Sequence, residues 1–150
     1  MSNDESALAS VTRLRVRALS YMPGFLWYAF LSQRHAKRAP GFVGGALLVD
    51  AHRTFWTLTV WESEKAMKAF RGSDAHARVM PRLTKWCDEA AYAHWTVPIA
   101  SGIPSWPEAY DRLVTEGKLS RVENPSSDHV DRKFASPRLK PTIGRELKRY

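Results

Sequence analysis

Three arginines occupy alternate positions in the segment VTRLRVRAL, which covers residues 11–19. Alternation of this kind predicts a strand on which Arg13, Arg15 and Arg17 share one face. Burying a guanidinium costs several kcal/mol unless the charge is paired. The row therefore predicts carboxylate partners, a polar cavity or an anionic ligand, because a guanidinium binds carboxylate and phosphate through paired hydrogen bonds. Arg15 is our candidate for anchoring a ligand, and ion pairing across a subunit interface or exposure to solvent is the structural alternative.

Two histidines could supply a ligand or a base. His76 begins an apolar stripe at helical spacing, and His94 falls on the last predicted strand. An imidazole in either place could bind a metal or take up a proton if a hydrogen bond held its second nitrogen. A histidine satisfied within a core or interface is the alternative. No HExxH or HxxH spacing occurs, so the sequence predicts no dedicated zinc site.

The positive charge is unevenly distributed. The net charge is +8, yet residues 11–38 contain six Lys or Arg and no acid, and residues 137–150 contain five against one Glu. A basic chain can meet nucleic acid, an anionic surface or an acidic small molecule. No nucleic-acid motif accompanies the charge, so the sequence does not favour that partner. A solvated surface with a basic tail is the plainer interpretation.

Length and composition predict one globular domain, with 150 residues of which 44% are hydrophobic. No apolar run is long enough to span a membrane, and the first ten residues lack the features of a signal peptide. Cys87 is the only cysteine, so no internal disulfide can form. We therefore expect a cytoplasmic protein.

The order of predicted elements is β-α-β-β-α-β. Strands are expected over 11–19, 42–49, 54–61 and 91–97, and helices over 25–38, over 64–70 and after Gly72-Ser73-Asp74. Pro81 predicts a kink or a restart near Met80, on the helical stripe that runs from His76 to Cys87. Gly44-Gly45 in the second strand predicts a bulge or a close backbone approach. This order predicts an α+β, ferredoxin-like fold with helices on one face of an antiparallel sheet. Because the other face also needs cover, we expect a second copy of the chain there, which makes a dimeric α/β barrel.

Three regions follow from this order. Residues 1–10 are predicted to be disordered, 11–98 to form the barrel domain and 99–150 to form a C-terminal arm. The arm should contain one helix in SWPEAYDRLVTEG, ended by Gly117. The remainder is irregular and basic, and it would wrap its own domain, wrap a partner or stay mobile.

The run LTVWESEKAMKAFRGSDAH, with Trp61-Glu62-Ser63 at a strand-to-helix corner, resembles the dimeric α+β barrel monooxygenase superfamily. Pro40-Gly41-Phe42 before the second strand is the other local match. The spheroidene-monooxygenase-like branch is the most similar, beside the antibiotic-biosynthesis and heme-degrading branches. The resemblance covers residues 11–97 and implies an oxygenase-like enzyme acting on a hydrophobic, planar and in some cases anionic small molecule. The alternative is a non-catalytic protein on the same fold that binds a small molecule or heme.

The resemblance also implies a site, with either heme or no cofactor. Heme-degrading members place a Trp late in the first short helix and an axial His on the next, where this chain has Phe70 and Met80. His76 lies one turn before Met80 and could take the ligand role. The expected residues are His76 as the catalytic base and a cofactor ligand, Met80 as a second cofactor contact, and Arg15, Trp27, Phe70 and His94 in substrate binding.

Overall fold

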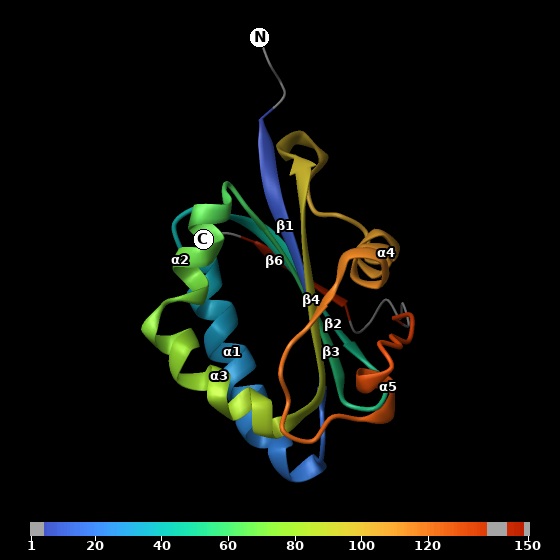
Figure 1. Ribbon diagram of the computed structural model, residues 1–150. Helices are drawn as coiled ribbons and strands as arrows, with labels where there is room; N and C mark the ends of the chain where they lie inside the picture. The colour runs from blue at the N-terminus through green and yellow to red at the C-terminus, as the bar shows by residue number, and fades with distance from the viewer. Residues whose placement is uncertain (1–4, 138–143, 149–150) are drawn as a thin grey trace.

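The computed structural model describes residues 5–137 and 144–148. A single antiparallel sheet forms the centre of the molecule, with strand order β5-β4-β1-β3-β2-β6 (Figure 1). Its four inner strands are β1 (Ser6–Val16), β2 (Phe42–Asp50), β3 (Thr54–Trp61) and β4 (Cys87–Pro98). The order β4-β1-β3-β2, with helices in the two crossovers, is the ferredoxin-like arrangement, so the predicted fold class is confirmed.

Three helices cover one face of this sheet. They are α1 (Met22–Arg38), which follows the short 3₁₀ turn η1 (Leu19–Tyr21), α2 (Glu64–Arg71) and α3 (Asp74–Trp86). The corner before α2 is capped by Ser63, whose Oγ accepts a hydrogen bond from the Ala66 N–H at 3.1 Å. Helix α3 runs through Pro81 without restarting. Burial of Leu83, 7% exposed, helps offset the backbone hydrogen bond that proline cannot donate.

Two strands begin earlier than their sequence predicted. Strand β1 starts at Ser6, so the predicted disorder is wrong for residues 6–10, which pair with β4 and in part with β3. The small residues Ala7 and Ala9 have low strand propensity, and burial in a central strand overrides it. Strand β4 starts at Cys87, which was expected on a helical stripe. Burial, and then the charge of Asp88, raises the pKa of the Cys87 thiol to about 12.

Strand β2 contains the irregularity that its glycines predicted. The pairing with β3 shifts between Phe42 and Gly44. A Cβ atom on Gly45 would lie 2.4 Å from the carbonyl oxygen of Leu58, so only glycine fits there. This confirms the predicted bulge and the close approach of two backbones.

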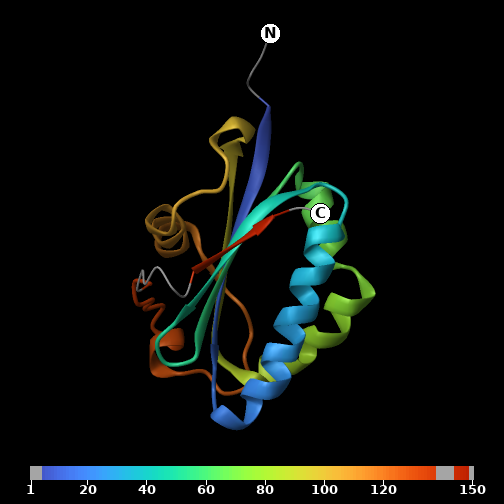
Figure 2. The same ribbon diagram turned by 180° about the vertical axis from the view of Figure 1, so that it is seen from behind.

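The C-terminal arm covers the second face of the sheet, opposite α1–α3 (Figures 1 and 2). Its elements are the 3₁₀ turn η2 (Ile99–Ser101), α4 (Trp106–Glu116), β5 (Lys118–Leu119), α5 (Ser127–Val130) and β6 (Gly144–Lys148). Ala109 and Leu113 of α4 are fully buried in the core on this face. Strand β5 pairs with β4 and β6 pairs with β2, so the arm also supplies both edge strands. The expectation that a second copy covers this face is therefore wrong, and the homodimer itself stays a prediction.

The arginine row meets carboxylates of the neighbouring strand on this same face. Arg13 Nη1 donates to Glu89 Oε1 at 2.7 Å, and Arg15 donates to Glu89 Oε2 at 3.0 Å and to Asp88 Oδ2 at 3.1 Å. Strand register explains the contact, because Arg15 lies opposite Glu89. Arg13 and Glu89 are only 5% and 4% exposed. Arg13 and Arg15 therefore have the carboxylate partners that the row predicted, within their own chain, whereas Arg17 donates to the Tyr21 hydroxyl at 2.8 Å.

The arm forms hydrogen bonds with this cluster of Arg13, Arg15, Asp88 and Glu89 and with the strand β4 that carries its carboxylates. Ser126 donates its hydroxyl to Glu89 Oε2 at 2.7 Å, and His129 Nδ1 accepts the Ala90 N–H at 3.3 Å. Burial raises the pKa of Glu89, but hydrogen bonds from Arg13 and Ser126, with the charges of both arginines, outweigh it and leave that pKa below its ordinary value. Glu89 is thus ionised and joins two strands and the arm.

We predict that Glu89→Gln strongly destabilises the fold, because it leaves the buried guanidinium of Arg13 without its ion-pair partner and removes one of the two carboxylates that pair with Arg15. The expected loss in the free energy of unfolding at pH 7 is about 3–5 kcal/mol. Urea denaturation followed by circular dichroism measures it. The matched control is Glu116→Gln, which breaks an exposed pair with Arg112 on α4 and should cost at most about 0.5 kcal/mol. Equal losses in the two variants would contradict a structural role for the cluster.

Candidate functional site

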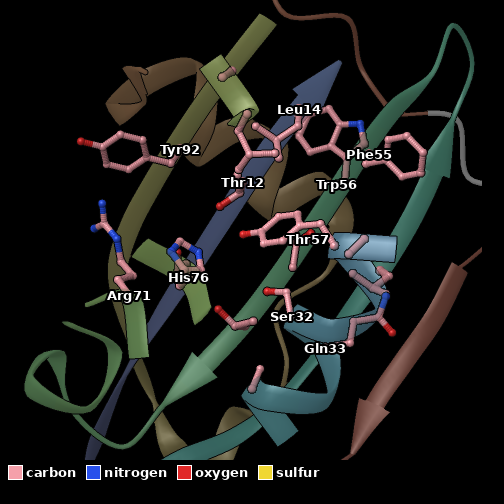
Figure 3. Close-up of a pocket in the computed structure, with 18 of the residues that line it drawn as sticks. Thr12, Leu14, Ser32, Gln33, Phe55, Trp56, Thr57, Arg71, His76 and Tyr92 are labelled. Carbon is pink, nitrogen blue, oxygen red and sulfur yellow. The ribbon is translucent and has the colours of Figure 1, made fainter. Parts of the chain in front are cut away.

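A cavity of about 380 Å³ lies between the sheet and helices α1–α3 (Figure 3). Small-molecule sites usually measure roughly 300–1,000 Å³, so the cavity suits a compact ligand. Its floor carries hydroxyl and imidazole groups of the sheet, and its opposite wall is formed by helices. The polar lining residues of the strands are Ser10, Thr12, Thr57, Thr59, Tyr92 and His94.

Side chains alternate between the two faces of the sheet along each strand, and this determines which residues form the floor of the cavity. Thr12 of β1 lies directly opposite Thr57 of β3 and Tyr92 of β4, so these three side chains share one face of the sheet. Arg13 and Arg15 belong to the other face for the same reason. The inner side of α1 adds Ser32 and Gln33 across from the floor (Figure 3). The result is a pocket with hydrogen-bonding groups on an otherwise apolar lining.

His76 enters the cavity from the first turns of α3 (Figure 3). Its Nδ1 atom is buried and has no hydrogen-bond partner among the residues that the structure describes. Burial lowers the pKa of His76, and so do the charges of Arg71 and His35, while an interaction with the backbone of Arg71 opposes them. The imidazole is therefore neutral near pH 7, with a lone pair available for a proton or a metal.

Arg71 gives one side of the cavity a positive charge. Its guanidinium lies 5.5 Å from the centre of the Tyr92 ring, and that ring lies 5.3 Å from the ring of His94. Figure 3 shows Arg71, Tyr92 and His76 on the same side of the pocket. Where the structure describes side chains, no carboxylate forms an ion pair with Arg71. Burial, and then the charge of Arg71, lowers the pKa of His94. An anionic group would be stabilised here.

Aromatic rings form the remaining walls. The Phe70 ring lies 5.1 Å from the Trp61 ring and 5.5 Å from the imidazole of His76. Tyr28 also lies near His76, with 6.3 Å between ring centres. Burial raises the pKa of Tyr28, aided by Cys87 and opposed by a hydrogen bond with Ser32, so the hydroxyl stays protonated. Walls of this kind favour a flat, unsaturated ligand.

A family model described as Domain of unknown function (DUF3291) matches residues 6–119. The chain belongs to this family. The match spans the whole of the inner sheet and α1–α4, and thus the strands and helices that form most of the cavity. No curated protein matches the chain by sequence.

Several solved structures share the fold at low sequence identity. A conserved protein from Methanosarcina mazei Go1 is 14% identical with a TM-score of 0.55, covering 62% of this chain and 94% of that chain. A Bacteroides thetaiotaomicron protein of unknown function, described as a possible oxidoreductase, is 10% identical with a TM-score of 0.55 over 62% and 99%. A "Putative antibiotic biosynthesis monooxygenase" from Nitrosomonas europaea is 13% identical with a TM-score of 0.53 over 59% and 95%. These similarities confirm the predicted ferredoxin-like α+β fold, and they show the fold alone.

The structure brings together four of the predicted site residues. Phe70, His76, Met80 and His94 all line the cavity. Helices α2 and α3 supply the first three, and strand β4 supplies the fourth.

Arg15 and Trp27 are not at the cavity. Arg15 lies on the opposite face of the sheet, because it has the other parity on β1, and it is paired with Asp88 and Glu89. Trp27 is 63% exposed on the outside of α1. Sequence analysis chose the wrong side of α1, because the outer side carries larger apolar residues than the inner side.

Arg71, Tyr28 and Tyr92 are among the cavity-lining residues that were not predicted as site residues. Arg71 is the last residue of α2, directly after Phe70, and nothing local in the sequence connects it with β4. Tyr28 is one of several aromatic residues of α1, and its position in the sequence does not single it out from the others. Tyr92 carried a usable signal, since it lies two residues before His94 and must share its face of the strand.

We predict that Arg71→Gln raises the pKa of His76, because removing a nearby positive charge makes protonation easier. Titration of the His76 ring proton by NMR measures the change. Arg112→Gln on α4, across the sheet, is the matched control and should leave the pKa of His76 in place. A pKa of His76 that does not move in Arg71→Gln would contradict their electrostatic contact.

Proposed function

We propose that this chain is an oxygenase-like oxidoreductase that acts on a hydrophobic, planar small molecule that becomes anionic in the cavity. The observation that carries the proposal is His76, a neutral imidazole whose buried Nδ1 atom has no partner among the described residues. Arg71 supports it from the same side, because no carboxylate among the described side chains forms an ion pair with it. So does a fold shared with the Nitrosomonas europaea protein, whose description names a monooxygenase.

His76 would act as the base. It would remove a proton from an acidic CH₂ or hydroxyl group of the substrate, and Arg71 would stabilise the enolate that forms. The hydroxyls of Thr12, Thr57 and Tyr92 would hold the substrate oxygen by hydrogen bonds. The protein itself needs no redox group for this, because an electron-rich enolate can donate electrons to oxygen.

The oxidation balances without an added reductant. The enolate gives one electron to O₂, and the two radicals combine to form a carbon–oxygen bond. The protonated His76 returns its proton to the peroxide anion, which becomes a hydroperoxide. Cleavage of the O–O bond and of the C–H bond on the same carbon then releases water and leaves a ketone. One atom of O₂ enters the product and the other leaves in water, and the four electrons come from the substrate.

The small-molecule ligand predicted from the sequence would occupy this cavity. The homodimer stays a prediction. The apolar walls would also shield the enolate from bulk water.

We predict that His76→Ala lowers the rate of oxidation by about 10²-fold or more, since general-base catalysis contributes about that much. The probe is anthrone, a planar three-ring ketone with an acidic CH₂ group, and the measurement is oxygen uptake. The matched control is His52→Asn in the β2–β3 turn, where asparagine tolerates the positive φ of 59°. An unchanged rate in His76→Ala would remove His76 from the mechanism. Absence of turnover by the wild type would leave a binding function.

A second candidate is heme binding without turnover of the substrate class above. His76 and Met80 lie one turn apart on α3, both line the cavity, and imidazole and thioether are both common axial ligands of heme iron. The donor set therefore fits a single axial bond, which either His76 or Met80 would supply while the other contacts the heme, because residues one turn apart on a helix lie on the same side of the porphyrin. Bound heme would supply an iron centre able to react with oxygen. The cavity is near the lower end of the usual range, so a porphyrin would extend through the opening beside Met80, which is 39% exposed.

Titration with hemin tests this second candidate. A saturable Soret shift at one heme per chain is expected if heme binds, and both His76→Ala and Met80→Ala should alter the spectrum. Val114→Ala, an exposed substitution on α4, is the control and should leave the spectrum unchanged. No Soret shift would remove heme from the account.

A further inference from the structure

The outer side of α1 carries an exposed apolar patch. Leu26, Trp27, Phe30 and Leu31 are 48%, 63%, 49% and 43% exposed. Their spacing places them on one side of the helix, and the rings of Trp27 and Phe30 stack with 5.9 Å between centres. We call these four residues the α1 patch. Apolar groups gathered in this way on a surface usually mark a contact with another molecule or a membrane.

The α1 patch is continuous with the opening of the cavity. Leu26 and Phe30 belong to the patch and also line the cavity. Val49 of β2 and Met80 of α3 are likewise both exposed and cavity-lining. These four side chains mark where the cavity meets the surface, so anything that the patch contacts also lies beside the opening.

Positive charge surrounds the patch. Helices α1, α2 and α3 contain nine Lys or Arg against only Glu64 and Asp74, a net +7 compared with +8 for the chain. Arg34 and Arg38 are exposed and fall on the same side of α1 as the patch. The guanidinium of Arg34 lies 6.0 Å from the centre of the Phe30 ring. The layer that contains the opening is thus both apolar and cationic.

We propose that the α1 patch docks this protein on an anionic lipid surface. Trp27 and Leu31 would enter the interfacial region of the bilayer, where amphipathic aromatic rings are favoured. Arg34 and Arg38 would contact lipid phosphates, to which each basic residue adds attraction near an anionic membrane. The docking is peripheral, since no helix within the described residues has the length and hydropathy to cross a bilayer.

Charge argues against the other occupants of the patch. A two-fold contact between copies would bring the patch and its cations against the same cations of the second copy. The phosphates of a nucleic acid would be complementary to the positive charge. Its phosphates and sugars, however, give Trp27 and Leu31 no apolar surface to pack against. An anionic bilayer is complementary both to the positive charge and to the apolar side chains of the patch.

Docking would have a consequence for the site. A lipophilic substrate dissolved in the bilayer would reach the cavity through the opening beside Leu26 and Phe30 without crossing water. This consequence rests on the proposed function, whereas the docking does not.

Co-sedimentation with vesicles tests the docking. The protein should bind vesicles of phosphatidylcholine mixed with phosphatidylglycerol far better than phosphatidylcholine alone, and added salt should weaken the binding. The double variant Trp27→Ser/Leu31→Ser should lose about tenfold or more in affinity. Val114→Ser/Val130→Ser removes two exposed valines of α4 and α5 on the opposite side and should bind like the wild type.

Two results of the vesicle experiment would overturn the docking. The wild type could fail to bind the mixed vesicles, or Trp27→Ser/Leu31→Ser could bind them as well as the wild type does. A wild-type dimer that this variant converts to a monomer would assign the patch to a second copy. A duplex oligonucleotide that binds wild type and variant alike and displaces the vesicles would assign the charge to nucleic acid. Neither Trp27 nor Leu31 lines the cavity, so anthrone oxidation in solution should be unchanged in the variant, which separates this proposal from the proposed function.

Discussion

The buried contact of Arg13 and Arg15 with Glu89 determines which face of the sheet can hold a ligand. Glu89 neutralises the charge that β1 brings into the core, and Ser126 ties the arm to the same carboxylate. The arm then covers this face with α4 and completes both edges of the sheet. The ion pairs and the arm therefore occupy one face of the sheet. The other face carries hydroxyl groups beneath helices α1–α3, and the cavity lies between them.

The cavity's chemistry comes from a few side chains on a widely used fold. Similar folds occur in proteins with little sequence in common, so the fold alone does not assign a reaction. In this chain the cavity contains a neutral imidazole beside a cation with no described carboxylate partner, within aromatic walls. His76 and Arg71 together suit a substrate that is neutral when it enters and negative when it reacts. Burial keeps His76 in its basic form, and Arg71 favours the anion.

Local patterns predicted much of this fold. Strand β3 was predicted with its observed bounds, because its β-branched and aromatic residues alternate between two buried faces, and Ser63 marked the start of α2. Long-range packing could not be predicted in the same way. Cover of the second face by α4 depends on contacts between distant segments, and the meeting of Arg71 with Tyr92 depends on how α2 lies beside β4. Trp27 misled the prediction because α1 is apolar on both sides, and periodicity alone does not say which side meets the sheet.

A crystal structure of the protein with 2-naphthoate, a planar aromatic carboxylate, would test the central claim most directly. The account predicts that the naphthalene rings lie between the sheet floor and the walls at Phe70 and Tyr28. The carboxylate should lie within hydrogen-bond distance of Arg71 and face the imidazole of His76. A naphthoate bound at Arg15, or bound outside the cavity with Arg71 and His76 untouched, would contradict the assignment of this cavity as the functional site.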